Sequence, residues 1–154
     1  MSDPMLNKPL PELTLETDGG RQINLSDWKG SKTVLYFYPK DNTSGCTAQA
    51  CDFRDNMERI TAAGYQVFGV SRDSVKKHDN FKDKYELNFP LISDPEEKLC
   101  DAFGVMKEKS MYGKKYMGIE RSTFIINEEG KVTAAWRKVK VPGHVDEVLE
   151  ALTA

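Results

Sequence analysis

The chain has 154 residues and a formal net charge of −2, which predicts one domain over residues 1–154 and excludes the strong positive field of a nucleic-acid-binding protein. Its 39% hydrophobic and 30% charged residues are typical of a chain that folds around a core, which excludes disorder as the main state. The densest apolar run, residues 34–38, is far shorter than the roughly 18 residues of a membrane span, so we expect partners that are small molecules or proteins.

The N-terminal part of the chain is predicted to form a hairpin, a buried strand and a helix. Residues 13–15 and 22–25 flank a glycine-containing turn at 18–20, the pattern of a β-hairpin. Residues 33–38 are apolar, β-branched or aromatic, as in a strand covered on both faces, and this run stops at Pro39. After the polar loop 40–45, apolar residues at three- and four-residue spacing predict an amphipathic helix from Cys46 to about residue 63.

The rest of the chain continues this alternation. A buried strand at 66–71 precedes a helix at about 74–86 capped by Ser74, and a short strand at 89–92 precedes a helix that Asp94 caps and that runs to residue 103. Residues 105–120 are predicted to be the longest irregular stretch, a loop with solvated lysines and with Met106, Met111 and Met117 along its underside. Strands at 121–127 and 131–136 and a helix at 144–152 follow.

This order of elements predicts an α/β fold with a mixed central sheet flanked by helices on both faces. In such sheets the chemistry collects at the carboxyl ends of the strands, where the next helix begins. The segment from residue 38 to Cys46 is a junction of this kind. Unpaired N–H groups and the positive end of the helix dipole favour thiolate over thiol there, so Cys46 is predicted to be nucleophilic.

The spacing of the other cysteines and of the histidines does not by itself indicate a site. Cys51 follows Cys46 by five residues, which is not the Cys-x-x-Cys spacing of thioredoxin-type enzymes. On spacing alone both thiols could simply pack in the core, and Cys100 is interpreted as a packing residue. The two histidines, His78 and His144, lie in distant segments without companion ligands, so no metal site is predicted.

Pro39, Thr43 and Cys46 fit the pattern Pro-x-x-x-Thr-x-x-Cys, which resembles the active-site signature of the peroxiredoxins, thiol peroxidases on a thioredoxin-like fold. Residues 36–43, 45–47, 50–51 and 53–55 look like the peroxiredoxin Q subfamily, also called bacterioferritin comigratory protein. Residues 89–94, 103–105 and 118–124 are similar too, so the resemblance covers nearly the whole chain. Ser44 is a departure, because this subfamily more often has proline there.

The resemblance implies a thioredoxin-like fold, with the N-terminal hairpin as an extension, and a reaction that needs no metal, haem or flavin. Cys46 would be the peroxidatic cysteine, which attacks the O–O bond of hydrogen peroxide or an organic hydroperoxide and becomes a sulfenic acid. Cys51 would be the resolving cysteine, and thioredoxin or a similar dithiol reductant would open the resulting intramolecular disulfide. An intramolecular pair permits a monomer, which we expect.

Four more residues would form the peroxide pocket by the same resemblance. The Thr43 hydroxyl would hold the peroxide, and Arg121 would stabilise the thiolate and the leaving oxygen. Pro39 would shape the pocket, and backbone N–H groups near Cys46, at Gly45, would add donors. As alternatives, Thr43 is only a loop hydroxyl bonded to local backbone and Arg121 only a charge at a strand end.

Two other function classes stay open from the sequence: a general disulfide reductase, and a redox sensor or holdase in which disulfide formation only alters a binding surface. Repeated turnover of peroxide with a thioredoxin system would favour the peroxidase, with a role in antioxidant defence. The first residues show neither the basic segment nor the apolar stretch of a secretory signal, so we expect a cytosolic protein.

Overall fold

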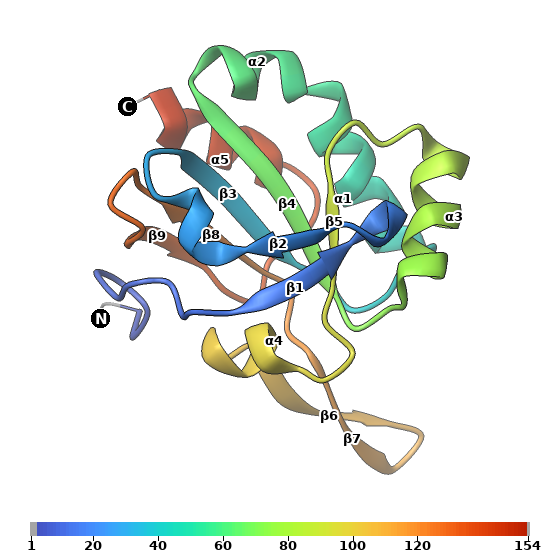
Figure 1. Cartoon of the computed structure of the whole chain (residues 1–154). Helices are drawn as coiled ribbons and strands as arrows, with labels where there is room; N and C mark the ends of the chain where they lie inside the picture. The colour runs from blue at the N-terminus through green and yellow to red at the C-terminus, as the bar shows by residue number, and fades with distance from the viewer. Residues whose placement is uncertain (1–2, 154) are drawn as a thin grey trace.

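The computed structural model describes residues 3–153 and contains one large sheet, one small sheet and five α-helices (Figure 1). The large sheet has the strand order β2-β1-β5-β4-β3-β8-β9 and the small one pairs β6 with β7. The strands are β1 Thr14–Thr17, β2 Gln22–Asn24, β3 Lys32–Phe37, β4 Tyr65–Ser71, β5 Leu91–Ser93, β6 Met106–Met111, β7 Lys114–Ile119, β8 Ser122–Ile126 and β9 Val132–Trp136. The helices are α1 Ser44–Asp55, α2 Met57–Ala62, α3 Val75–Tyr85, α4 Lys98–Ala102 and α5 His144–Thr153, with 3₁₀ turns at Asp18–Gly20 and Leu25–Trp28.

The large sheet is mixed, as predicted. β3 pairs with β4 and β4 with β5 in parallel, whereas β8 runs antiparallel to both β3 and β9. β1 and β2 form the predicted N-terminal hairpin, and β1 joins the sheet through an antiparallel pairing with β5. β3 therefore lies in the interior of the sheet, and its carboxyl end leads into the loop before Cys46.

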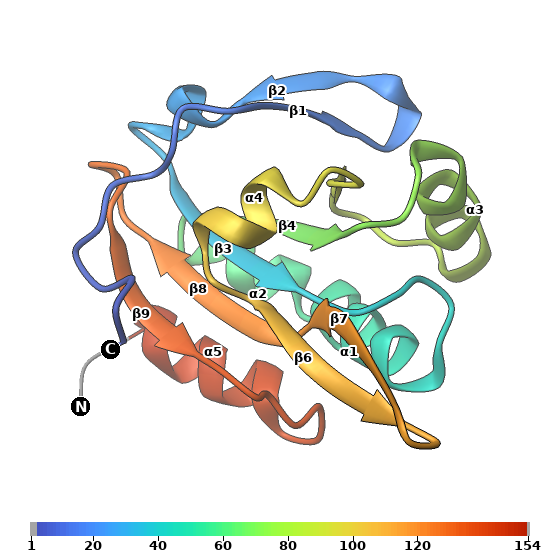
Figure 2. The ribbon, with the colours of Figure 1, turned by 90° about the horizontal axis from the view of Figure 1, so that it is seen from below.

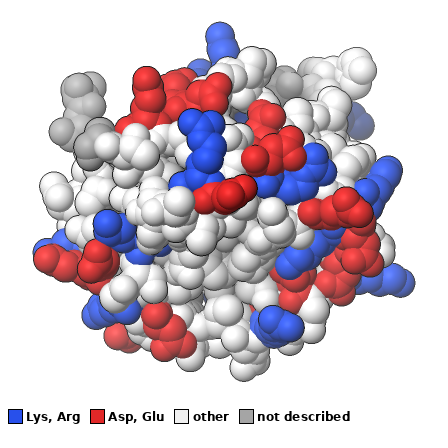
Figure 3. All heavy atoms as spheres, turned by 90° about the horizontal axis from the view of Figure 1, so that it is seen from above, with Lys and Arg blue, Asp and Glu red and all other residues white. Residues whose placement is uncertain are grey.

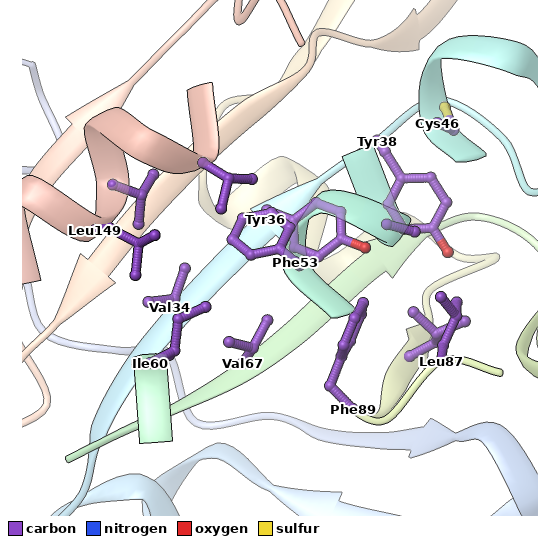
Figure 4. Close-up of a cluster of buried hydrophobic side chains, with 14 of the residues drawn as sticks. Val34, Tyr36, Tyr38, Cys46, Phe53, Ile60, Val67, Leu87, Phe89 and Leu149 are labelled. Carbon is purple, nitrogen blue, oxygen red and sulfur yellow. The ribbon is translucent and has the colours of Figure 1, made fainter. Parts of the chain in front are cut away.

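Each face of the sheet carries its own hydrophobic core, because alternate residues of β3 point to opposite faces. Val34 and Tyr36 pack into a cluster with residues of α1, α2, α3 and α5 (Figure 4). Leu35 and Phe37 pack on the other face, with residues of α4. Figure 2 shows α4 and the α1, α2 and α5 group separated by the sheet. The predicted helices on both faces are confirmed.

The helix predicted from Cys46 to residue 63 is two helices. α1 begins at Ser44, two residues earlier than predicted, and ends at Asp55, because the backbone leaves helical geometry at Asn56 (φ −109°, ψ 6°). Asn56 donates its side-chain amide to the Asp52 carbonyl at 2.8 Å and its backbone N–H to the Phe53 carbonyl at 3.1 Å. A short polar side chain that bonds local backbone competes with helix continuation, which accounts for the break.

The helix predicted from Asp94 is shorter than expected and begins only at Lys98. Glu97 has a left-handed backbone (φ 62°), and Arg72 holds its carboxylate at 2.9 Å. Asp94 therefore does not directly precede the helix, but its Oδ2 still accepts the N–H of Cys100, in the first turn of α4, at 2.8 Å. By contrast, Ser74 caps α3 as predicted, accepting the N–H of Lys77.

Residues 105–120, predicted to be irregular, contain the β6–β7 hairpin. Its turn places Tyr112 (φ 53°) and Gly113 (φ 79°) in the left-handed region, as a two-residue type I′ turn requires. Most of its side chains are exposed, so the strands lack the apolar alternation by which half-buried strands are predicted. Met111 and Met117 are 57% and 53% exposed and do not line an underside, whereas Met106 packs against the core.

The surface drawn in Figure 3 carries acidic and basic side chains interspersed with uncharged ones. Among the residues that the structure describes, no helix is long and apolar enough to cross a membrane.

Candidate active site

Cys46 lies in the first turn of α1, directly after the loop that follows β3. Its side chain is 2% exposed and its thiol is free, and Figure 4 places it on α1 beside Tyr38. The first bond of α1 runs from the Thr47 N–H to the Thr43 carbonyl at 2.8 Å, so the N–H groups just before it have no partner within the helix. This end of the helix favours a negative charge, which a thiolate would supply.

Arg121 approaches Cys46 from the short connection between β7 and β8. Its Nη2 lies 3.3 Å from the Cys46 Sγ, and its Nη1 donates to the Gln49 Oε1 at 2.6 Å. A Cβ on Gly45 would lie 3.3 Å from Nη2, so the absence of a side chain there lets the guanidinium come close to α1. Arg121 is thus bound to two residues that are one helical turn apart on the same helix.

Thr43 and Pro39 lie in the loop before Cys46, with Pro39 half-buried and Thr43 exposed. The Thr43 hydroxyl donates to the Lys40 carbonyl at 3.0 Å, the local bond considered as the alternative from the sequence. Its single proton is therefore used within the loop, and only its lone pairs are free to accept. The structure places Arg121 in contact with Cys46, whereas Thr43 is exposed and its hydroxyl bonds within its own loop.

The other two thiols lie in different surroundings. Cys51 is half-buried in the second turn of α1 and is free. Cys100 is fully buried in α4 within the second core cluster, where burial, and then the charge of Asp94, raises the pKa of its thiol. Cys100 thus packs in the core on the far side of the sheet from Cys46, as predicted.

Comparisons with known proteins decide the family. The model of the AhpC/TSA family matches residues 6–135. The chain belongs to this family. Peroxiredoxin Bcp of Xanthomonas campestris is 53% identical over 156 residues, covering 100% of this chain and 98% of the relative. Peroxiredoxin Bcp of Bacillus subtilis is 52% identical over 147 residues, covering 96% and 94%.

Solved structures agree with these relatives. A structure of Xanthomonas campestris peroxiredoxin Q has a TM-score of 0.88 and 52% identity, and the match covers 94% of this chain and 95% of that one. The predicted peroxiredoxin Q subfamily and thioredoxin-like fold are confirmed. The chain is a thiol peroxidase, an oxidoreductase of the antioxidant peroxiredoxins.

Sequence reasoning missed a buried network that anchors the active-site loop of this peroxiredoxin. The Tyr38 hydroxyl donates to the Asp41 Oδ1 at 2.5 Å, and the Asp41 Oδ2 lies 2.6 Å from the His78 Nδ1. His78 Nε2 lies 2.9 Å from the Ile92 carbonyl, so both ring nitrogens face acceptors, as in a protonated ring. Burial works to lower the pKa of His78, but the hydrogen bond and charge of Asp41 outweigh it and the pKa is raised.

No local pattern could have revealed this network, because His78 and Asp41 are 37 residues apart. Gln49 was missed as well, although its place one turn after Cys46 on a predicted helix was a usable signal. His144 is buried beside β8, with its Nε2 2.8 Å from the Thr123 hydroxyl. Burial, and then the positive charge of Arg121, lowers the pKa of His144 to about 4, so this second histidine is neutral near pH 7.

Among residues 3–153, no three histidine, cysteine or acidic side chains are grouped so as to hold a metal ion.

Proposed function

We propose that Cys46 is the peroxidatic cysteine and that Arg121 is its electrostatic partner. The observation that carries the proposal is the 3.3 Å contact between the Arg121 guanidinium and the buried Cys46 sulfur. The thiolate attacks one peroxide oxygen, the O–O bond breaks, and the other oxygen leaves as hydroxide or alkoxide and takes up a proton. The products are a Cys46 sulfenic acid and water or an alcohol.

The pocket residues divide the remaining work. Arg121 faces the sulfur with Nη2 while Gln49 holds Nη1, so its positive charge is fixed where the leaving oxygen becomes negative. Thr43 accepts a hydrogen bond from the peroxide, because its own proton is given to the Lys40 carbonyl. The N–H groups of the first turn of α1, at Gly45 and Cys46, add donors, and Pro39 closes the pocket beside the sulfur.

Cys51 is proposed as the resolving cysteine. Its thiol attacks the Cys46 sulfenic acid, water leaves, and an intramolecular disulfide forms within α1. Thioredoxin or a similar dithiol protein then reduces this disulfide and is itself oxidised. Because both cysteines lie in one chain, a monomer completes the cycle, and the cytosol, where dithiol reductants are kept reduced, is its expected compartment.

Substrates include hydrogen peroxide and organic hydroperoxides. Support for the second class comes from a solved structure of the Xanthomonas campestris bacterioferritin comigratory protein, 51% identical, which is described as a trapped intermediate/ligand complex bearing on alkyl peroxide reduction.

The test is NADPH consumption by thioredoxin reductase and thioredoxin in the presence of excess peroxide. Wild type is expected to turn over many times, and Cys46→Ser to lose activity, because a serine hydroxyl stays protonated and forms no sulfenic acid. Cys51→Ser should consume about one equivalent of peroxide and then stall with thioredoxin. Activity of Cys46→Ser comparable to wild type would refute the assignment, and a single turnover by wild type would favour a sensor.

A further inference from the structure

The β6–β7 hairpin holds all the large hydrophobic side chains that are prominently exposed among residues 3–153. They are Met111 (57% exposed), Tyr112 (97%), Tyr116 (43%) and Met117 (53%). Figures 1 and 2 show this hairpin projecting from the large sheet. Exposed apolar side chains gathered on one element mark an interaction site more often than scattered ones do.

The two faces of the hairpin differ in charge. From the pairing of Lys107 with Gly118, Lys109 with Tyr116 and Met111 with Lys114, these residues share one face. We call this the basic face; it consists of Lys107, Lys109, Met111, Lys114 and Tyr116, with Tyr112 at its tip. On the opposite face, Glu108 and Lys115 pair at 3.6 Å and neutralise each other.

The basic face carries a local positive charge. It has three lysines and no carboxylate of the hairpin, and these lysines form no ion pair among residues 3–153, although the charge of Lys107 acts on Asp3 and that of Glu120 acts on Lys109. The whole chain has a net charge of −2, so this is a local positive patch on a slightly acidic protein. A partner that fits it presents carboxylates around an apolar centre.

The basic face continues to the active site. Lys109 lies across Gly118, where a Cβ would meet its stem at 3.1 Å, and its Nζ donates to the Ile119 carbonyl at 2.6 Å. Ile119 ends β7, two residues before Arg121, which contacts Cys46. Burial, and then the positive charge of Arg121, lowers the pKa of Lys109, as expected for a lysine close to that guanidinium. A protein bound to this face would therefore lie beside Cys46.

We propose that the basic face of the β6–β7 hairpin docks the dithiol reductant, a protein with an acidic rim around an apolar surface at its own cysteines. This inference rests on the proposed function, because it assigns a binding surface to the protein that reduces the Cys46–Cys51 disulfide. A second copy of this chain is a poorer occupant. A twofold interface on this face would bring its lysines against those of the other copy.

The test compares two double variants with matched controls. Met111→Gln/Tyr112→Asn removes the apolar centre and keeps the turn, because asparagine tolerates the positive φ of residue 112. Lys107→Glu/Lys114→Glu inverts the charge. Met117→Gln, an exposed methionine on the opposite face, controls for the first variant. Lys8→Glu, in the exposed N-terminal segment, controls for charge in the second.

Three rates are measured for each protein: Cys46 oxidation by peroxide, turnover with dithiothreitol, and kcat/KM for a bacterial thioredoxin supplied with its reductase and NADPH. Each double variant is expected to lose about 10-fold in kcat/KM for thioredoxin, the scale on which charge and anchor residues alter association. Its other two rates, and all rates of both controls, should match wild type. The thioredoxin reaction of wild type should also weaken with salt more steeply than that of Lys107→Glu/Lys114→Glu.

Unchanged thioredoxin kinetics in both double variants would overturn the proposal, as would equal losses in the controls. Slower Cys46 oxidation in the double variants would assign the face to the peroxide instead. If sedimentation shows a wild-type dimer that Met111→Gln/Tyr112→Asn dissociates, with thioredoxin kinetics intact, the occupant is a second copy. Wild-type turnover with dithiothreitol but not with thioredoxin would defeat the docking proposal and leave the peroxidase function standing.

Discussion

Formation of the proposed disulfide requires α1 to unwind. Cys46 and Cys51 both lie within the continuous helix Ser44–Asp55. Five residues of α-helix advance about 7.5 Å and turn about 140° beyond one full turn, which separates the two Cα atoms by roughly 8.7 Å. A disulfide tolerates at most about 7 Å, and the two side chains here point to different faces. We therefore expect oxidation to unfold the first turns of α1.

The contacts of α1 determine the free energy that is needed to open its first turns. Burial of Cys46 and Ala50 contributes about 2 kcal/mol, from roughly 0.8 kcal/mol for each CH₂-sized group. The two hydrogen bonds of Arg121, to Cys46 and Gln49, contribute about 1.5 to 3 kcal/mol each, because the donor is charged. Opening of the reduced helix should therefore require about 5 to 8 kcal/mol, equivalent to amide protection of roughly four to six orders of magnitude.

Hydrogen exchange of the amides of residues 47–51 tests this expectation. Protection should be high in the reduced protein and should largely disappear after one equivalent of peroxide, with mass spectrometry locating the Cys46–Cys51 bond. The amides of α5, which carries neither cysteine, serve as the internal control and should not change. An oxidised protein that contains the bond and still protects residues 47–51 as well as the reduced protein does would refute the reasoning.

The remaining predictions concern single residues. Arg121→Lys should slow Cys46 oxidation about 100-fold in stopped-flow, because the planar fork is lost. Cys100→Ser should keep near-normal turnover but lose about 1 to 3 kcal/mol in urea unfolding through a buried hydroxyl. The pKa of His144 is about 4 in the folded protein against 6.5 ordinarily. The unfolded state therefore binds the proton first, and the free energy of unfolding falls by about 3 kcal/mol as the pH falls from 6.5 to 4. His144→Gln should abolish this pH-dependent loss of stability. His78 acts oppositely: its raised pKa gives stability below pH 6.5 that is lost as pH rises through the folded pKa, and His78→Asn should remove that dependence.

The parts of the fold predicted from sequence are those whose burial follows a recognisable pattern, periodic in helices and continuous in the central strands. The run that forms β3 is buried from Thr33 to Phe37, so its composition alone marks a central strand. The β6–β7 hairpin was predicted to be irregular because its side chains are mostly exposed and give no apolar alternation in the sequence. Its local turn geometry, with Tyr112 in the left-handed region, stabilises the hairpin. The early end of one predicted helix and the late start of another depended on single residues, Asn56 and Glu97, whose side chains bond nearby groups.

The candidate site also consists of residues that the sequence predicts and residues that it does not. Pro39, Thr43 and Cys46 are close in sequence, so a motif could group them, and the resemblance extended the group to Arg121. The hydrogen bond between Asp41 and His78 joins the active-site loop to α3, and no spacing encodes it. Long-range contacts of this kind depend on how β3, β4 and β5 align, which composition does not specify.

The break at Asn56, the largest error of the helix prediction, bears directly on the proposed mechanism. A single helix from Cys46 to residue 63 would couple the unwinding of its first turns to the packing of Ile60, which is fully buried against the sheet. In the structure α1 ends before α2 begins, and Phe53, stacked on Tyr36 with ring centroids 4.6 Å apart, anchors the last turn of α1. On the other side, Asp41 is fixed by Tyr38 and His78. The segment between Asp41 and Phe53 therefore lies between two anchors, so it can open to form the disulfide while the sheet and α2 keep their packing.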